Sequence, residues 1–134
     1  MRTRLIFNGP WEMEGSRDPY GGETAGAVSR EARFDPAIDV FETEEGTVVR
    51  MEIAGMRRRD ISVELVADIL VIRGRRRERP AGRKVTYHRL EIEYGAFERR
   101  VRIASPVRED AVSAVYREGL LEVRLPRRRG GGEG

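Results

Sequence analysis

The chain has 134 residues, of which 37% are charged and none is Cys. This length allows one domain with a modest hydrophobic core, and the lack of Cys excludes a disulfide framework and thiol chemistry. No apolar run approaches about eighteen residues, so the sequence predicts no membrane-spanning helix and we expect no membrane partner. The N-terminal apolar stretch is too short for a secretory signal, and we therefore expect a cytoplasmic protein.

Residues 1–34 are predicted to form a flexible N-terminal arm. Residues 8–33 are rich in Gly, Glu, Ser and Pro, and have too few aliphatic side chains to offset the entropy lost on ordering. A small apolar cluster lies near the start of the arm, made of Leu5, Ile6, Phe7 and Trp11. Apolar groups on such an arm can adapt to many partners, so we interpret the cluster as a binding element for unfolded proteins. The alternative is that it packs on this domain or within an oligomer.

From Phe34 to Pro126 apolar and polar residues alternate with a period of two, which is typical of half-buried strands. The predicted strands are Ala37–Glu42, Thr47–Ala54, Ile61–Val66, Ile69–Arg73, Tyr87–Glu93, Ala96–Ile103, Val112–Arg117 and Leu120–Leu125. Many short strands separated by Gly, Pro and Asp predict an all-β, immunoglobulin-like antiparallel β-sandwich over residues 35–126. The polar loop at 75–84 is longer than a hairpin requires. Residues 127–134 are predicted to be a short flexible polar tail.

The charge balance argues against nucleic acid as a partner. The pI is about 9.8, which by itself is typical of nucleic-acid binding. However, 26 basic residues face 23 acidic ones, and 25 of the basic residues are Arg, so the pI reflects a small excess of groups that never deprotonate near neutrality. Arginine runs occur at 57–59, 75–77 and 127–129, but acids follow each run closely and no aromatic residues interleave to stack on bases.

Candidate catalytic or metal-binding residues are few. The single His, His88, falls in a predicted strand, where a partly exposed structural imidazole is expected. Glu91 and Glu93 on one strand face provide too few ligands for a metal ion. No serine nucleophile elbow or phosphate-binding Gly loop is present. We therefore predict that the protein is not an enzyme and needs no cofactor.

Two sequence runs carry a resemblance to a known family. The first is a Tyr-Gly-x-Phe-x-Arg run at 94–99. The second is an Ala-x-Tyr-x-x-Gly-x-Leu run at 114–121, which is followed by a closing Leu-Pro at 125–126. With the segments at 35–40 and 53–56, they resemble the α-crystallin domain of the small heat-shock proteins over about residues 35–126.

The resemblance implies an ATP-independent holdase chaperone whose partners are unfolded client proteins and further copies of itself. In prokaryotic and plant members, the strand equivalent to Tyr87–Glu93 leaves its own subunit and pairs with a neighbour's sheet edge, forming a homodimer. The implied dimer residues are Tyr87, Leu90, Ile92 and Tyr94, together with Arg99 as a member of an ion pair. Gly55 and Gly119 match the family's corner glycines.

The resemblance also implies a hydrophobic groove between the strands 61–66 and 112–117. Its residues would be Ile61, Val63, Leu65, Val112, Ala114 and Tyr116, with Ala114 as a small residue packed beneath the sheet. In the family, an Ile-x-Ile segment of the C-terminal tail docks in this groove. Here no aliphatic residue follows Leu125, so assemblies larger than the dimer are left open.

Two other functions stay open from the residues alone. The first is a β-sandwich co-chaperone that docks on one specific partner, although the long loop and extra strand at 75–94 suit strand exchange better. The second is a basic nucleic-acid-binding sandwich, which a steep decrease of affinity with salt would reveal.

Overall fold

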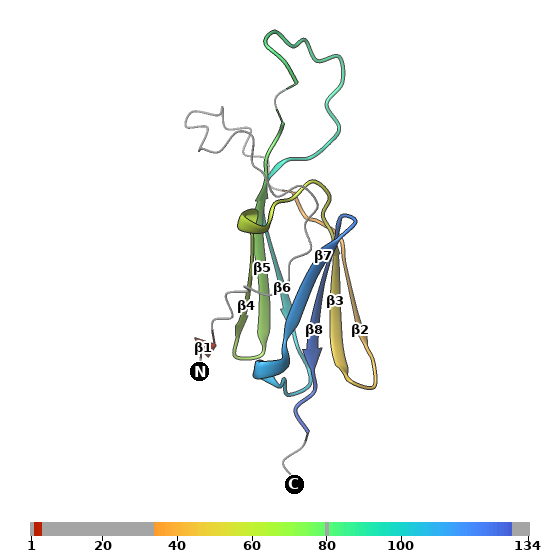
Figure 1. The fold of residues 1–134 in the computed structure, drawn as a ribbon, viewed down its shortest axis with the longest axis vertical. Helices are drawn as coiled ribbons and strands as arrows, with labels where there is room; N and C mark the ends of the chain where they lie inside the picture. The colour runs from red at the N-terminus through yellow and green to blue at the C-terminus, as the bar shows by residue number, and fades with distance from the viewer. Residues whose placement is uncertain (1, 4–33, 80, 130–134) are drawn as a thin grey trace.

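The computed structural model describes residues 2–3, 34–79 and 81–129. Two antiparallel four-stranded sheets pack face to face (Figure 1). The first has the order β1 (Arg2–Thr3), β4 (Ile61–Val66), β5 (Ile69–Arg76) and β6 (Gly95–Arg102). The second has the order β2 (Ile38–Glu42), β3 (Gly46–Glu52), β8 (Leu120–Pro126) and β7 (Ser113–Arg117). Two short 3-10 turns, η1 (Arg58–Asp60) and η2 (Glu109–Ala111), complete the elements. The predicted all-β antiparallel sandwich is confirmed.

The hydrophobic core lies between the two sheets and follows directly from the period of two. Every second residue of the central strands points inward and is fully or almost fully buried. The largest of these side chains are Met51, Ile53, Leu65, Leu70, Ile72, Leu121 and Leu125. The alternation in sequence therefore predicted both the strands and the face that each one buries.

The corner after β3 is fixed to the β7–β8 hairpin by one buried hydroxyl. The Tyr116 hydroxyl donates to the Ile53 carbonyl at 2.7 Å and accepts from the Met56 backbone N–H at 3.2 Å. The Ile53 N–H donates to the Gly119 carbonyl at 2.8 Å. Gly119 has φ +79° in the two-residue turn of the hairpin, a conformation that glycine adopts without steric strain. Tyr116 is thus a structural residue of the sandwich.

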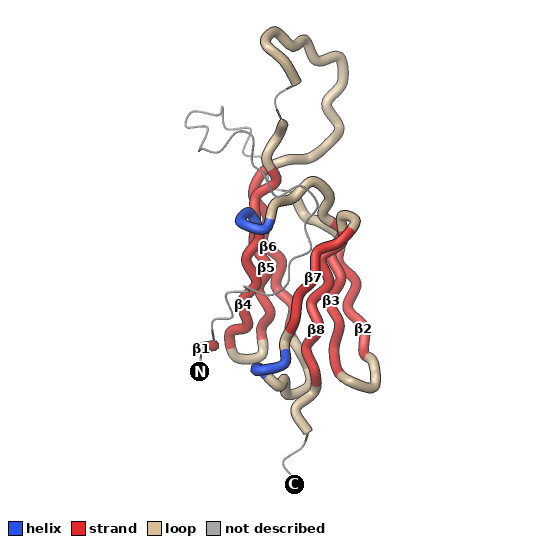
Figure 2. Tube along the Cα trace, viewed as in Figure 1, coloured by secondary structure: helices blue, strands red, loops and turns tan. Residues whose placement is uncertain are grey.

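The structure differs from the predicted strands at the connection between β5 and β6. β5 continues to Arg76 because Arg75 and Arg76 pair with Ala96 and Gly95 of β6. The loop therefore runs over 77–94 and projects beyond the end of the sandwich (Figure 2). The segment 87–93, predicted as a strand, is loop here, because none of its residues pairs with a strand in the described part of the single chain.

We expect Gly74→Ala to destabilise the domain more than Gly55→Ala does. A Cβ at Gly74 would lie 2.5 Å from Phe97 Cζ and 2.6 Å from the Asp60 carbonyl oxygen, and the backbone oxygen cannot rotate away. Such overpacking should cost about 3 kcal/mol of unfolding free energy. A Cβ at Gly55 meets nothing within 4 Å, so only its φ of +74° opposes alanine, at about 1 kcal/mol.

Denaturant unfolding of the two variants and the parent measures both costs. An equal or smaller loss for Gly74→Ala would show that the strand shifts to accept the extra methyl group.

Candidate functional site

The loop 77–94 carries the most exposed apolar side chains of the described chain. Its described residues from Arg77 to Glu93 are all exposed, and Ile92 is 69% exposed. The other large apolar residues in this segment are Val85, Tyr87 and Leu90. These four side chains leave apolar surface on the loop that the sandwich does not cover.

The edge strand β2 offers a second exposed apolar position. Val40 pairs in register with Val49, which is fully buried, so Val40 faces the same inner side of the sheet. Nevertheless, Val40 is 46% exposed. β2 has only β3 as a neighbour, so among the described residues its outer backbone edge is unpaired. An unpaired edge beside an exposed valine is suited to receive another strand.

The predicted groove residues lie together, but they are part of the core. Ile61, Val63, Leu65, Ala114 and Tyr116 are all buried. Val112 is half-buried and packs against the same cluster. Their presence in a groove that receives a peptide stays a prediction.

The strand β1, near the N-terminus, lies beside the predicted groove residues of β4. Arg2 and Thr3 form β1, which pairs with Val66 and Leu65 at the outer edge of β4. The predicted binding cluster of Leu5, Ile6, Phe7 and Trp11 lies outside the described residues.

The predicted dimer arginine, Arg99, faces inward near an open edge. It pairs in register with Ile72, which is fully buried, so its side chain lies on the inner side of β6. Its side chain is half-buried, and no side-chain hydrogen bond or ion pair joins it to another residue that the structure describes. The ion pair predicted for Arg99 across a dimer therefore stays a prediction.

A second arginine, Arg76, was not singled out by the sequence. It lies at the base of the loop, where its guanidinium donates to the Glu93 carbonyl oxygen, at 2.9 Å from Nε. It also lies over the Phe34 and Tyr94 rings. The signal was present, because the inward alternation at Leu70, Ile72 and Gly74 extends to position 76. The run Arg75-Arg76-Arg77 concealed it.

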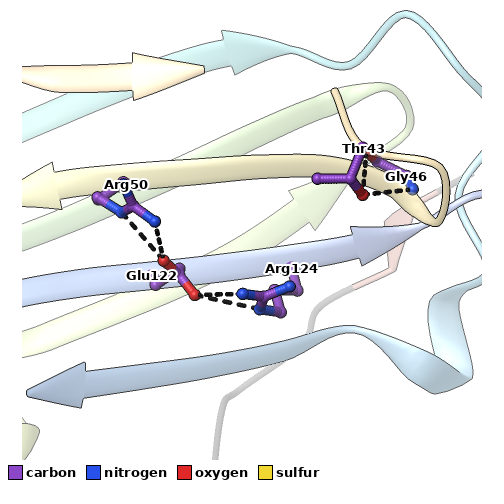
Figure 3. A network of polar contacts seen from close by, with 5 residues as sticks. All are labelled: Thr43, Gly46, Arg50, Glu122 and Arg124. Carbon is purple, nitrogen blue, oxygen red and sulfur yellow. Dashed lines mark hydrogen bonds and ion pairs between the residues drawn. The ribbon is translucent and has the colours of Figure 1, made fainter. Parts of the chain in front are cut away.

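The outer faces of both sheets carry networks of arginine and glutamate. On the second sheet, Arg50 Nη2 lies 2.7 Å from Glu122 Oε2, and Arg124 Nη2 lies 2.9 Å from Glu122 Oε1 (Figure 3). On the first sheet, Glu98 accepts from Arg73 Nε at 2.7 Å and from Arg100 Nε at 2.8 Å. The hydrogen bond from Arg73 lowers the pKa of Glu98 below its usual value, and a bond from Arg50 does the same to the pKa of Glu122.

A polar cleft of about 500 Å³ lies at the end of the sandwich away from the loop, between the β2–β3 turn and the end of β8. Three of its arginines pair with carboxylates at 2.9 to 3.3 Å: Arg108 with Asp110, Arg124 with Glu122, and Arg127 with Glu42. These pairs partly neutralise the charge that a phosphate would need.

The described residues include no group of three or more His, Cys, Asp or Glu that could hold a metal ion. His88 lies exposed in the loop rather than in a strand. The helices in the described ranges are single 3-10 turns, and neither could cross a membrane.

The two depressed glutamate pKa values predict a loss of stability in acid. A carboxyl whose pKa is lower in the folded chain stabilises it fully above its unfolded pKa, and this contribution disappears as the pH falls through the folded pKa. We therefore expect the unfolding free energy to decline as the pH falls from about 5 to below 4. Because both carboxylates are partly exposed, each should contribute less than about 1 kcal/mol.

Unfolding curves across this pH range measure the effect. Glu98→Gln with Glu122→Gln should flatten the decline, whereas Glu109→Gln, which removes an exposed carboxylate of η2, controls for the loss of charge. An unchanged slope in the double variant would contradict the assignment.

Comparison with known proteins places this architecture in one family. The model described as the Hsp20/alpha crystallin family matches residues 39–132. The chain is 29% identical over 113 residues to small heat shock protein C2 of Rickettsia felis, covering 84% of this chain and 70% of that one. It is 31% identical over 111 residues to the 17.6 kDa class I heat shock protein 1 of Arabidopsis thaliana, covering 82% and 72%.

Solved structures agree with the sequence relatives. The hspA structure from Xanthomonas axonopodis has a TM-score of 0.65 and 31% identity, over 72% of this chain and 97% of that one. A small heat-shock protein from Xylella fastidiosa has a TM-score of 0.65 and 28% identity, over 73% and 90%.

Proposed function

Because the chain belongs to the Hsp20/alpha-crystallin family of small heat-shock proteins, we propose that it is a holdase that binds partly unfolded proteins without ATP and keeps them from aggregating. The family supports a chaperone role, and its members are generally non-enzymatic. The observation that carries the proposal is the apolar surface left uncovered on the α-crystallin sandwich, at Val40 and along the loop at Val85, Tyr87, Leu90 and Ile92. Exposed apolar surface binds the apolar segments that unfolded proteins expose.

We propose that self-association proceeds by strand exchange. The segment 87–93 is exposed and belongs to neither sheet of its own described chain, and β2 has an open edge beside the exposed Val40. Pairing of this segment with β2 of a second copy would cover both at once and satisfy the free backbone groups of the edge. The likeness to the Xylella fastidiosa protein, whose structure is described as having a distinct high order structure, supports assembly.

The N-terminal arm is proposed to be the second binding element. β1 pairs with β4 at Leu65 and Val66, beside the predicted groove. Its backbone pairing supports an arrangement in which the residues that follow, Leu5, Ile6, Phe7 and Trp11, rest on apolar surface near β4 until they bind a client instead. Two half-buried side chains would contribute only about 3 kcal/mol before ordering costs, so such a contact is reversible.

We propose a cytoplasmic location, without nucleic acid or membrane as partner. The nearly balanced charge of the chain favours a protein partner over phosphate.

Purified protein without nucleotide should suppress the heat-induced light scattering of an aggregating client at a near-stoichiometric ratio. Leu5→Ser with Phe7→Ser should weaken this suppression because it removes apolar groups from the arm, while the unfolding midpoint of the sandwich stays unchanged. A requirement for ATP, or no suppression at several-fold excess, would rule out the holdase.

Deleting residues 84–93 should yield a folded but monomeric protein, because the exchanged segment is lost while the core strands stay intact. Sedimentation velocity across protein concentration measures the association. Leu90→Ser with Ile92→Ser keeps the loop length and should weaken the dimer less than the deletion. Unchanged association of the deletion variant would exclude strand exchange.

A further inference from the structure

The base of the loop 77–94 is closed by one strand pair. β5 ends at Arg76 and β6 begins at Gly95, and these two residues are partners in register. The chain therefore leaves and rejoins the sandwich at a single point. Arg76 has the same parity along β5 as the fully buried Ile72, so its side chain is directed to the inner side of the sheet.

The guanidinium of Arg76 holds backbone from both sides of this point. Its Nε donates to the Glu93 carbonyl oxygen at 2.9 Å, and Nη2 donates to the same oxygen. Its Nη1 donates to the Ala54 carbonyl oxygen at 3.4 Å. Glu93 belongs to the returning arm of the loop, whereas Ala54 belongs to the corner after β3 in the other sheet. One side chain thus ties the loop to both layers of the sandwich.

Two aromatic rings contact the same guanidinium. Its Cζ lies 4.5 Å from the centroid of the Phe34 ring and 5.5 Å from that of the Tyr94 ring. Phe34 is buried and packs edge-on against the core residue Phe97, with centroids 5.4 Å apart. Tyr94 is the last residue of the loop. Arg76 therefore connects the hydrophobic core, through Phe34, to the end of the loop.

We propose that Arg76 is a positioning residue for self-association, because it fixes the base of the loop and so presents the segment 87–93 to a second copy of this chain. The inference rests on the proposed strand exchange. A segment that is anchored at its base samples fewer orientations, so it loses less entropy when it pairs with a neighbour's edge. The effect acts on assembly and is separate from the packing of the core.

The chemistry of the site requires arginine. A planar guanidinium can stack on aromatic faces and direct several N–H groups to different carbonyl oxygens. A lysine at this position would keep the charge but would lose the fork and the stacking surface. We therefore expect lysine to be a poor replacement.

The test compares Arg76→Gln and Arg76→Lys with Arg73→Gln in the full chain. Arg73 lies on the same strand but on its outer face, where it pairs with Glu98 and Glu64. It thus controls for the loss of an arginine and its ion pairs. Sedimentation measures the dissociation constant of the assembly, hydrogen exchange reports on the amides of residues 85–92, and thermal unfolding reports on the sandwich.

We expect Arg76→Gln to raise the dissociation constant about tenfold and to accelerate exchange at residues 85–92. Arg76→Lys should recover little of the loss. Arg73→Gln should leave the dissociation constant and the exchange at residues 85–92 at the parent values. Its unfolding midpoint should change about as much as that of Arg76→Gln. Tyr94→Leu keeps the apolar bulk without the aromatic ring, and should raise the dissociation constant about threefold. It tests the same contact if Arg76→Gln fails to fold.

Two results would overturn the inference. If the variant without residues 84–93 is monomeric but Arg76→Gln or Tyr94→Leu assembles as tightly as Arg73→Gln, the loop is needed and Arg76 does not position it. If the variant without residues 84–93 assembles like the parent, strand exchange itself is wrong, and the inference about Arg76, which rests on it, is wrong as well.

Discussion

A strand at the edge of a β-sheet has backbone N–H and C=O groups that no neighbour satisfies, and the properties of this protein depend on how its edges are covered. β1 covers the edge of β4 with Arg2 and Thr3. Besides the short β1, the strands at the ends of the two sheets are β2, β6 and β7 in the described chain. At β2 the open edge lies beside an exposed valine, Val40. This edge therefore has both unpaired backbone groups and apolar surface. This combination is the reason for proposing β2 as the edge at which a second copy pairs.

The faces of the sheets are protected differently from their edges. Both outer faces carry arginine–glutamate networks, centred on Glu98 and Glu122. Such partly exposed pairs add little to folding stability. Their larger effect is to keep the broad faces hydrated, since interspersed charges of both signs disfavour apolar association. The proposed contacts with other proteins therefore fall on the edges and the projecting loop, away from these charged faces.

The sequence predicted the sandwich well because each core strand records its buried face in its own alternation. The prediction from sequence failed where a strand depends on a partner outside its own segment. The segment 87–93 has the pattern of a strand, but a strand also needs a partner, and none is within its reach in the described single chain. The inward direction of Arg76 follows from the alternation of β5, but the run of three arginines at 75–77 concealed it. For Arg99, the sequence could indicate the strand but not the group that its inward side chain meets.

The central pairing of the second sheet also determines when the domain can form. β3 pairs with β8 from Gly46 opposite Pro126 to Glu52 opposite Leu120, so the middle of this sheet joins the first half of the chain to its end. Contacts between such distant segments form slowly, since a long loop must close before they do. On the ribosome, the hairpin of β4 and β5 can form early, whereas the sandwich cannot close until the last strand has emerged. Until β8 has emerged, the inner face of β3 therefore lacks its central partner, and the nascent chain exposes apolar residues that favour aggregation.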